Sequence, residues 1–357
     1  LRIKSLHIHP IKSCAGSSVP SATIQRAGLA FDRTWLIIDA ATRAFCTARG
    51  SPHMVRIRPV LDHEAGLLRI YVPNSADEPA SGETEVVVPL TPSDEELRQC
   101  ELVEDVEIWG YKADGYAVSK EADEALSAFM GKPVRLLRKG PKHRPGGGDD
   151  PRGDESETAF QDFHSLTVVS AESLAQVQET LLASVYPEQD SAKALEAYPV
   201  SERVDRDFWT PDRLRSLAIE RFRINIVLET LPSSSRPALQ AWEEDCFTHL
   251  EVFPADAADD VDFGAEVKGQ GVGIDCNARC ARCLVPTVDP ETGKRDKAQM
   301  PYSLLQKYRQ VQPEMQKIGK PCFGMLSSPS QESGALHVGD VVRVTATRDP
   351  ATRPLTK

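Results

Sequence analysis

Residues 276–293 read CNARCARCLVPTVDPETG and place three cysteines, Cys276, Cys280 and Cys283, within eight residues. The whole chain has eight cysteines in 357 residues, and it is long enough to bury a core without disulfides. Clustered thiols in such a chain favour reduced cysteines that do chemistry, and hence an intracellular protein. The stretch therefore predicts a thiolate site.

Four interpretations of this cluster stay open from the residues alone. The spacing C-x3-C-x2-C also occurs in radical-SAM iron–sulfur enzymes, but here it lies late in the chain and Arg282 precedes the last cysteine. A structural zinc site would need a fourth ligand such as Cys246 or Cys322. In the third interpretation a single thiolate binds an oxo-metal centre, and Arg279 and Arg282 favour the thiolate and meet an anionic cofactor. The fourth is a thiol cluster without any ligand.

Composition sets the class of protein. Apolar residues make up 40% of the chain and charged residues 27%, as in ordinary globular proteins. The net charge of -11 argues against a nucleic-acid partner, because such proteins usually carry a basic face. There is no run of eighteen apolar residues. The first residue is Leu1, and an anchor or targeting segment could precede it.

Short apolar runs predict many strands and few helices. The expected strands cover residues 2–9, 34–39, 54–60, 67–72, 84–90, 165–169, 222–228, 248–253 and 341–347. One helix is expected between Ser119, its N-cap, and Gly131, a second after Ser170, and a third around 302–310. Residues 190–216 are charged and expected to be irregular or helical. Many short strands are typical of a barrel, so the predicted class is α+β and predominantly β.

A length of about 150 residues per domain predicts two domains. Residues 139–158, KGPKHRPGGGDDPRGDESET, are rich in Gly, Pro and charge. We therefore expect an N-terminal β-rich domain over 1–135, a linker or flexible loop over 136–160, and a second domain over 161–350.

Four motifs carry a resemblance to a known family. Residues 280–293 resemble the signature of MOSC domains, the family named for the C-terminus of molybdenum cofactor sulfurase. Residues 8–16 and 28–35 resemble the β-barrel domain that precedes MOSC, and 222–227 resemble the family's Arg-Pro-Asn strand, with Ile224 where Pro is common. The resemblance implies a MOSC β-barrel domain preceded by a smaller β-rich domain. The arrangement is similar to that of the amidoxime reducing components, which are molybdenum reductases.

The resemblance also implies a cofactor, molybdenum bound to molybdopterin, and the residues that hold it. Cys283 is expected to be the metal ligand and the catalytic residue. The other expected cofactor contacts are Lys12, Ser13, Arg33, Ser170, Ser173, Arg223, Asn225, Arg282 and Thr287. A pyridoxal phosphate label belongs only to the wider superfamily.

Elementary geometry bears on some of these residues. Arg223 and Asn225 alternate in the expected strand, so both would point to one face. Ser170 would cap a helix, whose N-terminus can bind an anion. Asp289 is expected to shape an Asp-Pro turn rather than to donate protons, and His164 to be structural rather than catalytic.

If the resemblance holds, the reaction is reduction of N-hydroxylated compounds such as amidoximes, hydroxylamines and hydroxamic acids. Electrons would come from an external carrier such as cytochrome b5 with its NADH-dependent reductase. The alternative is a cofactor-binding or sulfur-transfer module without reductase activity. The location would be the cytoplasm, or the cytosolic face of the mitochondrial outer membrane if an anchor precedes the chain. A basic stretch is either a solvated face or a docking patch for an acidic carrier: Lys294, Arg295, Lys297, Lys307, Arg309, Lys317 and Lys320.

Overall fold

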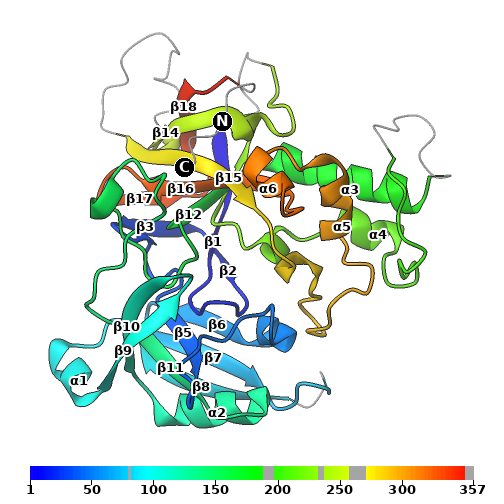
Figure 1. Ribbon diagram of the computed structural model, residues 1–357. Helices are drawn as coiled ribbons and strands as arrows, with labels where there is room; N and C mark the ends of the chain where they lie inside the picture. Colours follow the sequence, from blue (N-terminus) through cyan, green and yellow to red (C-terminus); the bar gives the residue numbers. More distant parts are fainter. Residues whose placement is uncertain (79–81, 188–196, 232–236, 257–270, 350–357) are drawn as a thin grey trace.

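The computed structural model describes residues 1–78, 82–187, 197–231, 237–256 and 271–349. Strands account for 35% and helices for 22%, which confirms the predicted α+β class with β dominant. Figure 1 shows two lobes, a barrel above and a smaller β-rich region below, with α3 to α6 beside the barrel. In the described part no helix is both long and apolar enough to cross a membrane.

Seven strands close the barrel, since the last in the order pairs with the first. The order is β13 (Ile226–Glu229), β12 (Leu166–Ser170), β16 (Cys322–Pro329), β15 (Val272–Ala281), β14 (Phe247–Phe253), β18 (Val341–Thr347) and β1 (Arg2–Ile8), and β1 pairs again with β13. β12 and β13 are parallel, whereas the other neighbours in this ring are antiparallel. β2 (Ser17–Val19) extends the sheet from β1.

The barrel interior is a packed core. Leu6, Val168, Leu250, Ile274 and Met325, from five of its strands, belong to one buried cluster and are each at most 1% exposed. Side chains fill a barrel of this size, so no channel runs through it. A ligand site must therefore lie at an end or on the outside of the barrel.

The lower lobe contains two sheets and a helix. One sheet has the order β5 (Trp35–Asp39), β11 (Val134–Lys139), β10 (Tyr111–Ala117) and β9 (Glu101–Ile108); the other has β6 (Arg58–Asp62), β7 (Leu67–Pro73) and β8 (Glu83–Pro89). The short α1 (Asp94–Gln99) precedes β9. Helix α2 (Lys120–Met130) begins at the predicted cap Ser119 and ends at Gly131, whose φ is 65°. Its buried face packs in one core with both sheets.

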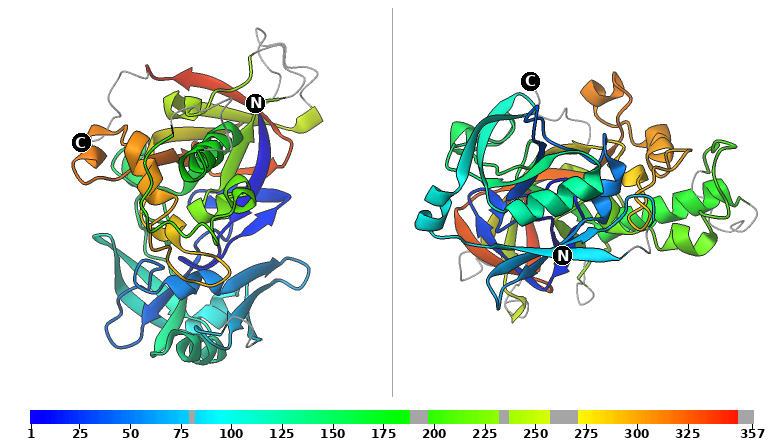
Figure 2. Two further views of the ribbon diagram at one scale, coloured as in Figure 1. Left: turned by 90° about the vertical axis from the view of Figure 1, so that its right-hand side faces the viewer. Right: turned by 90° about the horizontal axis from the view of Figure 1, so that it is seen from below.

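A third small sheet and four helices complete the fold. The sheet joins β17 (Ser333–His337), β3 (Ser21–Gln25) and β4 (Gly28–Leu29). The helices are α3 (Ala171–Val185), α4 (Pro211–Arg215), α5 (Tyr302–Tyr308) and α6 (Pro313–Gln316). Figure 2 shows them gathered on one side of the barrel. Helices α3, α4 and α5 share a core there with Phe323 and Val227, which face out from β16 and β13.

The closed barrel draws its strands from both sides of the expected division of the chain. β1 lies within 1–135 but closes the barrel, so the first strand belongs with the later residues. The expected linker, 136–160, begins inside β11 (Val134–Lys139) and then has no strand; its only helical turn is Gly153–Glu155. It is not simply an exposed loop, because Arg144 is 1% exposed and donates to Thr158 Oγ1 at 2.7 Å and to the carbonyl oxygen of Gln161 at 2.9 Å.

Two expected strands need correction. Residues 54–60 divide into a 3-10 helix, Pro52–Arg56, and β6. The strand expected over 222–228 begins only at Ile226, because Ile219–Phe222 is a 3-10 helix and Arg223 adopts a left-handed conformation with φ 56°. Of the region 190–216, residues 190–196 lie outside the described part, and the remainder contains α4.

Candidate functional site

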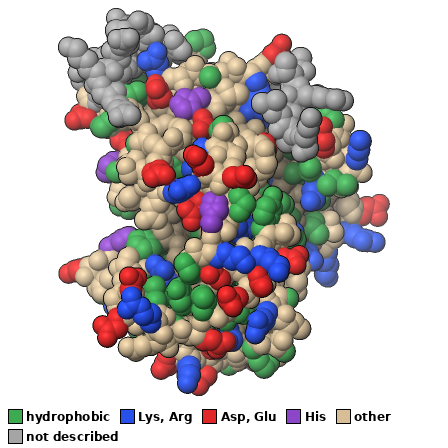
Figure 3. Space-filling view, turned by 60° about the vertical axis from the view of Figure 1, so that its left-hand side comes forward, with side chains coloured by type: hydrophobic (Ala, Val, Ile, Leu, Met, Phe, Trp, Pro, Cys, Tyr) green, Lys and Arg blue, Asp and Glu red, His purple; other side chains and the backbone are tan. Residues whose placement is uncertain are grey.

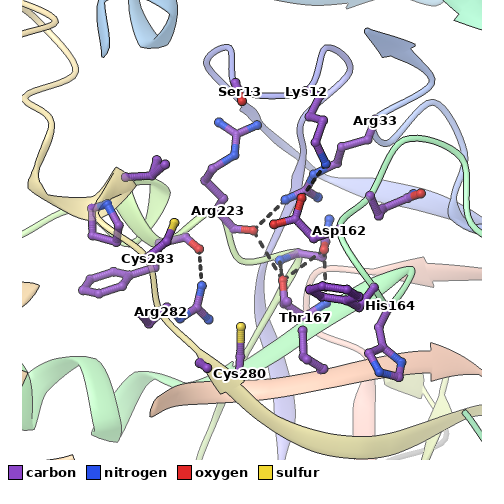
Figure 4. A pocket seen from close by; sticks show the side chains of 18 of the residues that line it. Lys12, Ser13, Arg33, Asp162, His164, Thr167, Arg223, Cys280, Arg282 and Cys283 are labelled. Carbon is purple, nitrogen blue, oxygen red and sulfur yellow. Dashed lines mark hydrogen bonds and ion pairs between the residues drawn. The ribbon is translucent and has the colours of Figure 1, made fainter. Parts of the chain in front are cut away.

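A cavity of about 140 Å³ lies where the end of β15 meets the lower lobe (Figure 4). Both lobes contribute to its wall. Seven of the ten sequence-predicted site residues line it: Lys12, Ser13, Arg33, Arg223, Asn225, Arg282 and Cys283. Ser170, Ser173 and Thr287 do not line it.

The loop after β1 brings Lys12 and Ser13 to the cavity. The N–H of Lys12 donates to the carbonyl oxygen of Trp35 at 2.9 Å, which fastens this loop to β5. Lys12 Nζ donates to the carbonyl oxygen of Phe160 at 2.6 Å and to Asp162 Oδ1 at 2.5 Å. Burial lowers the pKa of Lys12 to about 8, although the charge of Asp162 opposes the shift.

Asp162 accepts hydrogen bonds from several donors on one side of the cavity. Besides Lys12, it accepts from Trp109 Nε1 at 3.0 Å and faces Arg49 Nη2 at 3.4 Å. Burial alone would raise its pKa, but the charge and hydrogen bond of Lys12 outweigh burial and hold the pKa well below its usual range. Arg49 also lies over the Trp109 ring, 4.3 Å from its centroid. Asp162 is therefore an anion that holds two cations and an indole in place.

Arg33 and Arg223 form a second wall. Arg33 donates from Nη1 to Asp32 Oδ2 at 2.5 Å and from Nη2 to the carbonyl oxygen of Arg223 at 2.9 Å. Arg223 Nη1 donates to the carbonyl oxygen of Cys14. Its Nη2 is buried and has no hydrogen-bond partner among the described residues. Burial, reinforced by Arg33, lowers the pKa of Arg223 to about 10. A guanidinium with a spare buried donor is suited to an anionic ligand.

Arg282 positions the segment that carries Cys283. It donates from Nε to the carbonyl oxygen of Phe323 at 2.9 Å and from Nη1 to that of Phe222 at 2.7 Å, and it is 7% exposed. Its bonds are therefore to the protein rather than to a ligand. Arg279, the other arginine of the motif, faces Asp245 at 3.3 Å and does not line the cavity.

The three cysteines of the motif have different surroundings. Cys276 packs in the barrel core, while Cys280 and Cys283 line the cavity. Burial raises the pKa of the Cys280 thiol, and Cys283 is only half-buried. Within the described ranges no group of three or more His, Cys, Asp or Glu is placed to hold a metal ion. This arrangement does not support the iron–sulfur or zinc interpretation, and it leaves Cys283 as the accessible thiol of the motif.

Asn225 lines the cavity, but its side chain is engaged. Its Oδ1 accepts from the N–H and the hydroxyl of Thr167, both at 3.1 Å, and its Nδ2 donates to the carbonyl oxygen of His7 at 3.1 Å. The amide thereby ties β12 to β1. Thr287 is fully buried, and its hydroxyl donates to the carbonyl oxygen of Leu284 at 2.6 Å.

The N-terminus of α3 is already filled by the chain itself. Ser170 caps the helix as predicted, but its hydroxyl and that of Ser173 both donate to Glu244 Oε2 at 2.8 Å. Burial raises the pKa of Glu244. An internal carboxyl group thus occupies the position expected for a ligand anion, and the two serines bond it rather than line the cavity.

Asp289 and His164, which were expected to be structural, both have partners within the protein, and His164 also lines the cavity. Asp289 Oδ1 accepts from the N–H of Thr292 at 2.8 Å within the turn, and Oδ2 pairs with Arg221 at 3.1 Å. His164 is buried between Asp149, at 2.7 Å from Nε2, and Asn277, at 2.9 Å from Nδ1.

The sequence interpretation missed Asp162, Trp109 and Arg49. Asp162 stands shortly before the predicted strand 165–169, and a polar residue at the mouth of a strand was a usable signal. Trp109 lies in the turn between β9 and β10, and Arg49 lies in a loop. Nothing local indicates that either residue meets the cavity.

Charge in the cavity is predominantly positive. Among the described residues that line it are one carboxylate, Asp162, and six cations: Lys12, Arg33, Arg49, Arg221, Arg223 and Arg282. Backbone oxygens and carboxylates accept hydrogen bonds from most of these cations, yet Arg223 Nη2 has no acceptor in the described part of the chain. The cavity can therefore hold an anion beside a half-buried thiol.

Known proteins resemble this chain along most of its length. The family model of the MOSC N-terminal beta barrel domain matches residues 1–133, and that of the MOSC domain matches residues 155–343. Mitochondrial amidoxime-reducing component 1 of Danio rerio is 25% identical, over 95% of this chain and 83% of that protein. Mitochondrial amidoxime reducing component 2 of Bos taurus is 25% identical, over 95% and 82%.

A molybdenum cofactor sulfurase of Aspergillus oryzae is 27% identical over 95% of this chain. The chain spans only 40% of the length of that sulfurase. The matched segments include the residues that line the cavity at the end of β15. The chain belongs to the MOSC domain family.

Proposed function

We propose that the chain is a molybdenum-cofactor-dependent reductase of N-hydroxylated compounds, with Cys283 as the molybdenum ligand. The observation that carries the proposal is the cavity itself. There a half-buried thiol lies in one wall, and in another lies Arg223, whose buried Nη2 has no partner among the residues that the structure describes. The matched relatives are named amidoxime-reducing components and molybdenum cofactor sulfurases, which supports a molybdenum cofactor as the ligand of this cavity.

The residues present fit the chemistry of that cofactor. Lys12, Ser13, Arg33 and Arg223 would hold its phosphate, because they line the cavity as cations or as a hydroxyl. Cys283 would supply the soft sulfur ligand that the metal prefers. When bound, the cofactor supplies a two-electron redox centre. Asp162 orients Lys12 and Arg49, and Arg282 fixes the backbone that presents Cys283.

Substrates in this proposal are amidoximes, hydroxylamines and hydroxamic acids. Each would lose its N–O oxygen as water, so a turnover consumes two electrons and two protons. The electrons would come from an external carrier such as cytochrome b5 with its NADH-dependent reductase. We further propose that the protein works in the cytoplasm or, if an anchor precedes Leu1, on the cytosolic face of the mitochondrial outer membrane.

The test is benzamidoxime reduction with reduced methyl viologen, alongside molybdenum and pterin analysis. We expect Cys283→Ala to lose activity by about a hundredfold or more while pterin remains bound, because an interaction at the reacting centre is removed. Cys100→Ala is the matched control, since Cys100 lies at the end of α1 in the lower lobe. Full activity in Cys283→Ala, or wild-type protein unable to hold pterin, would contradict the proposal.

The sulfurase match supports a second candidate. At 27% identity over nearly the whole chain, the chain also resembles part of a molybdenum cofactor sulfurase. In that role it would hold the cofactor while sulfur is delivered to it, with no reductase activity of its own. Wild-type protein that binds molybdenum and pterin but does not reduce benzamidoxime would favour this candidate.

A further inference from the structure

An exposed apolar side chain lies between two lysines just after α6. Ile318 is 59% exposed, the largest fraction among the large hydrophobic side chains of the described residues. Lys317 precedes it, and Lys320 follows after Gly319. The carbonyl oxygen of Gly319 accepts from Gln306 Nε2 of α5 at 2.6 Å, so this turn has a fixed place. We call residues 317–320 the 317–320 surface.

This surface is joined directly to the backbone that carries Cys283. Lys320 is followed by Pro321, whose carbonyl oxygen accepts from the N–H of Arg282 at 2.8 Å. Arg282 is the chain neighbour of Cys283. One hydrogen bond and a few covalent bonds thus connect the protein surface to the cavity thiol. Figure 1 shows α5 and α6 beside the end of β15, as this connection requires.

Basic side chains predominate along the chain around the 317–320 surface. Lys307 of α5 and Lys317 are exposed, Lys320 is half-buried, and the acidic residue between them in the chain is Glu314 of α6. The whole chain carries a net charge of -11. On the face shown in Figure 3, acidic and basic side chains are interspersed instead. Arg309 does not belong to the surface, because it is 4% exposed and pairs with Asp245 at 2.7 Å.

We propose that the 317–320 surface docks an acidic one-electron carrier protein, whose electrons enter through Pro321 and Arg282 to Cys283. The inference rests on the proposed reductase function and adds the place of electron entry. A small apolar contact rimmed by lysines suits a transient complex, since charge speeds encounter and a limited interface allows release. Two successive carriers, each oxidised by one electron, supply each two-electron reduction of substrate.

The test measures reoxidation of a reduced acidic haem carrier, soluble cytochrome b5, by stopped flow. We expect Lys317→Glu with Lys320→Glu to slow the second-order rate by about tenfold at low ionic strength, and by much less at high ionic strength, because screening removes the electrostatic contribution. The control, Lys112→Glu with Lys120→Glu, makes the same change of charge at exposed positions of the lower lobe. Ile318→Ser should weaken carrier binding at both ionic strengths.

Two measurements separate this inference from the proposed function. Benzamidoxime reduction by methyl viologen needs no docking, so the Lys317 and Lys320 variant should retain it. Binding of the oxidised carrier, followed by titration calorimetry, should be the same in Cys283→Ala as in the wild type. Equal carrier rates in the Lys317–Lys320 variant and its control would overturn the docking site, as would a carrier that does not reduce the wild type. Loss of the methyl viologen reaction in the wild type would overturn the reductase instead.

Discussion

Two walls of one cavity use arginine in different ways. Arg282 directs its guanidinium at the carbonyl oxygens of Phe222 and Phe323, whereas Arg223 bonds the carbonyl oxygen of Cys14 and keeps a buried Nη2 without a partner in the described part of the chain. Both residues stand in the family motifs, so sequence alone gives them the same role. The contacts separate them: the first holds the protein together, and the second has a donor to offer a ligand.

The largest effect expected from this difference is on stability. Arg282→Ala removes the side-chain donors to the carbonyl oxygens of Phe222 and Phe323 and the cation near their rings. We expect the free energy of unfolding to fall by about 3 kcal/mol. Urea unfolding of cofactor-free protein measures it. Arg215→Ala is the control, because Arg215 is 56% exposed. A loss below about 1 kcal/mol would show that the bonds of Arg282 are not structural.

Arg223→Gln should show the opposite balance. The free energy of unfolding should change by less than about 1 kcal/mol, because the wild type already buries a donor that has no partner among the described residues. Glutamine can also still bond the carbonyl oxygen of Cys14. The affinity for the cofactor should fall by about tenfold, the value of one charge-assisted hydrogen bond. Pterin retention after dialysis measures this loss. Unchanged retention would remove Arg223 from the cofactor site and break the contrast with Arg282.

The sequence predicted those parts of the fold whose signals are local. Helix α2 was found from its cap Ser119 and its terminal Gly131, and β7 and β8 from alternating apolar residues. β9 was missed because its pattern is interrupted: the buried residues are Val103, Val106 and Ile108, and Asp105 between them has a φ of 58°. Such an interruption removes the strict alternation on which the prediction of a strand depends.

In the candidate site, too, the motifs predicted some residues, whereas other contacts are revealed only by the fold. Motifs predicted Lys12, Arg33, Arg223 and Cys283, which the fold brings to one cavity. Ser170 caps α3 as expected, but only the fold reveals that Glu244, far along the chain, fills the helix N-terminus. Motif spacing records which residues are present. Whether a side chain still has a donor or acceptor free for a ligand depends on its partners in the fold, which the sequence does not show.

Lys12 combines the two roles that separate Arg282 from Arg223, because it donates to the protein and also lines the cavity. The smallest effect is expected from its titration. Burial lowers its pKa to about 8, so its charge is present below that pH and is lost as the pH rises through it. Binding of sulfate, whose charge is constant between about pH 7 and 9, should weaken by about fivefold over that range, since one of several cations disappears.

Lys12→Arg is the matched variant, because a guanidinium stays charged throughout this range. Its sulfate affinity should change little between about pH 7 and 9, whereas the wild type should lose affinity around the pKa of Lys12. A bound anion favours the ammonium form, so saturating sulfate should move the wild-type midpoint above 8. Identical pH profiles for the two proteins would mean that Lys12 interacts with Asp162 and not with the bound anion. Its role would then be structural, like that of Arg282, rather than ligand-binding, like that of Arg223.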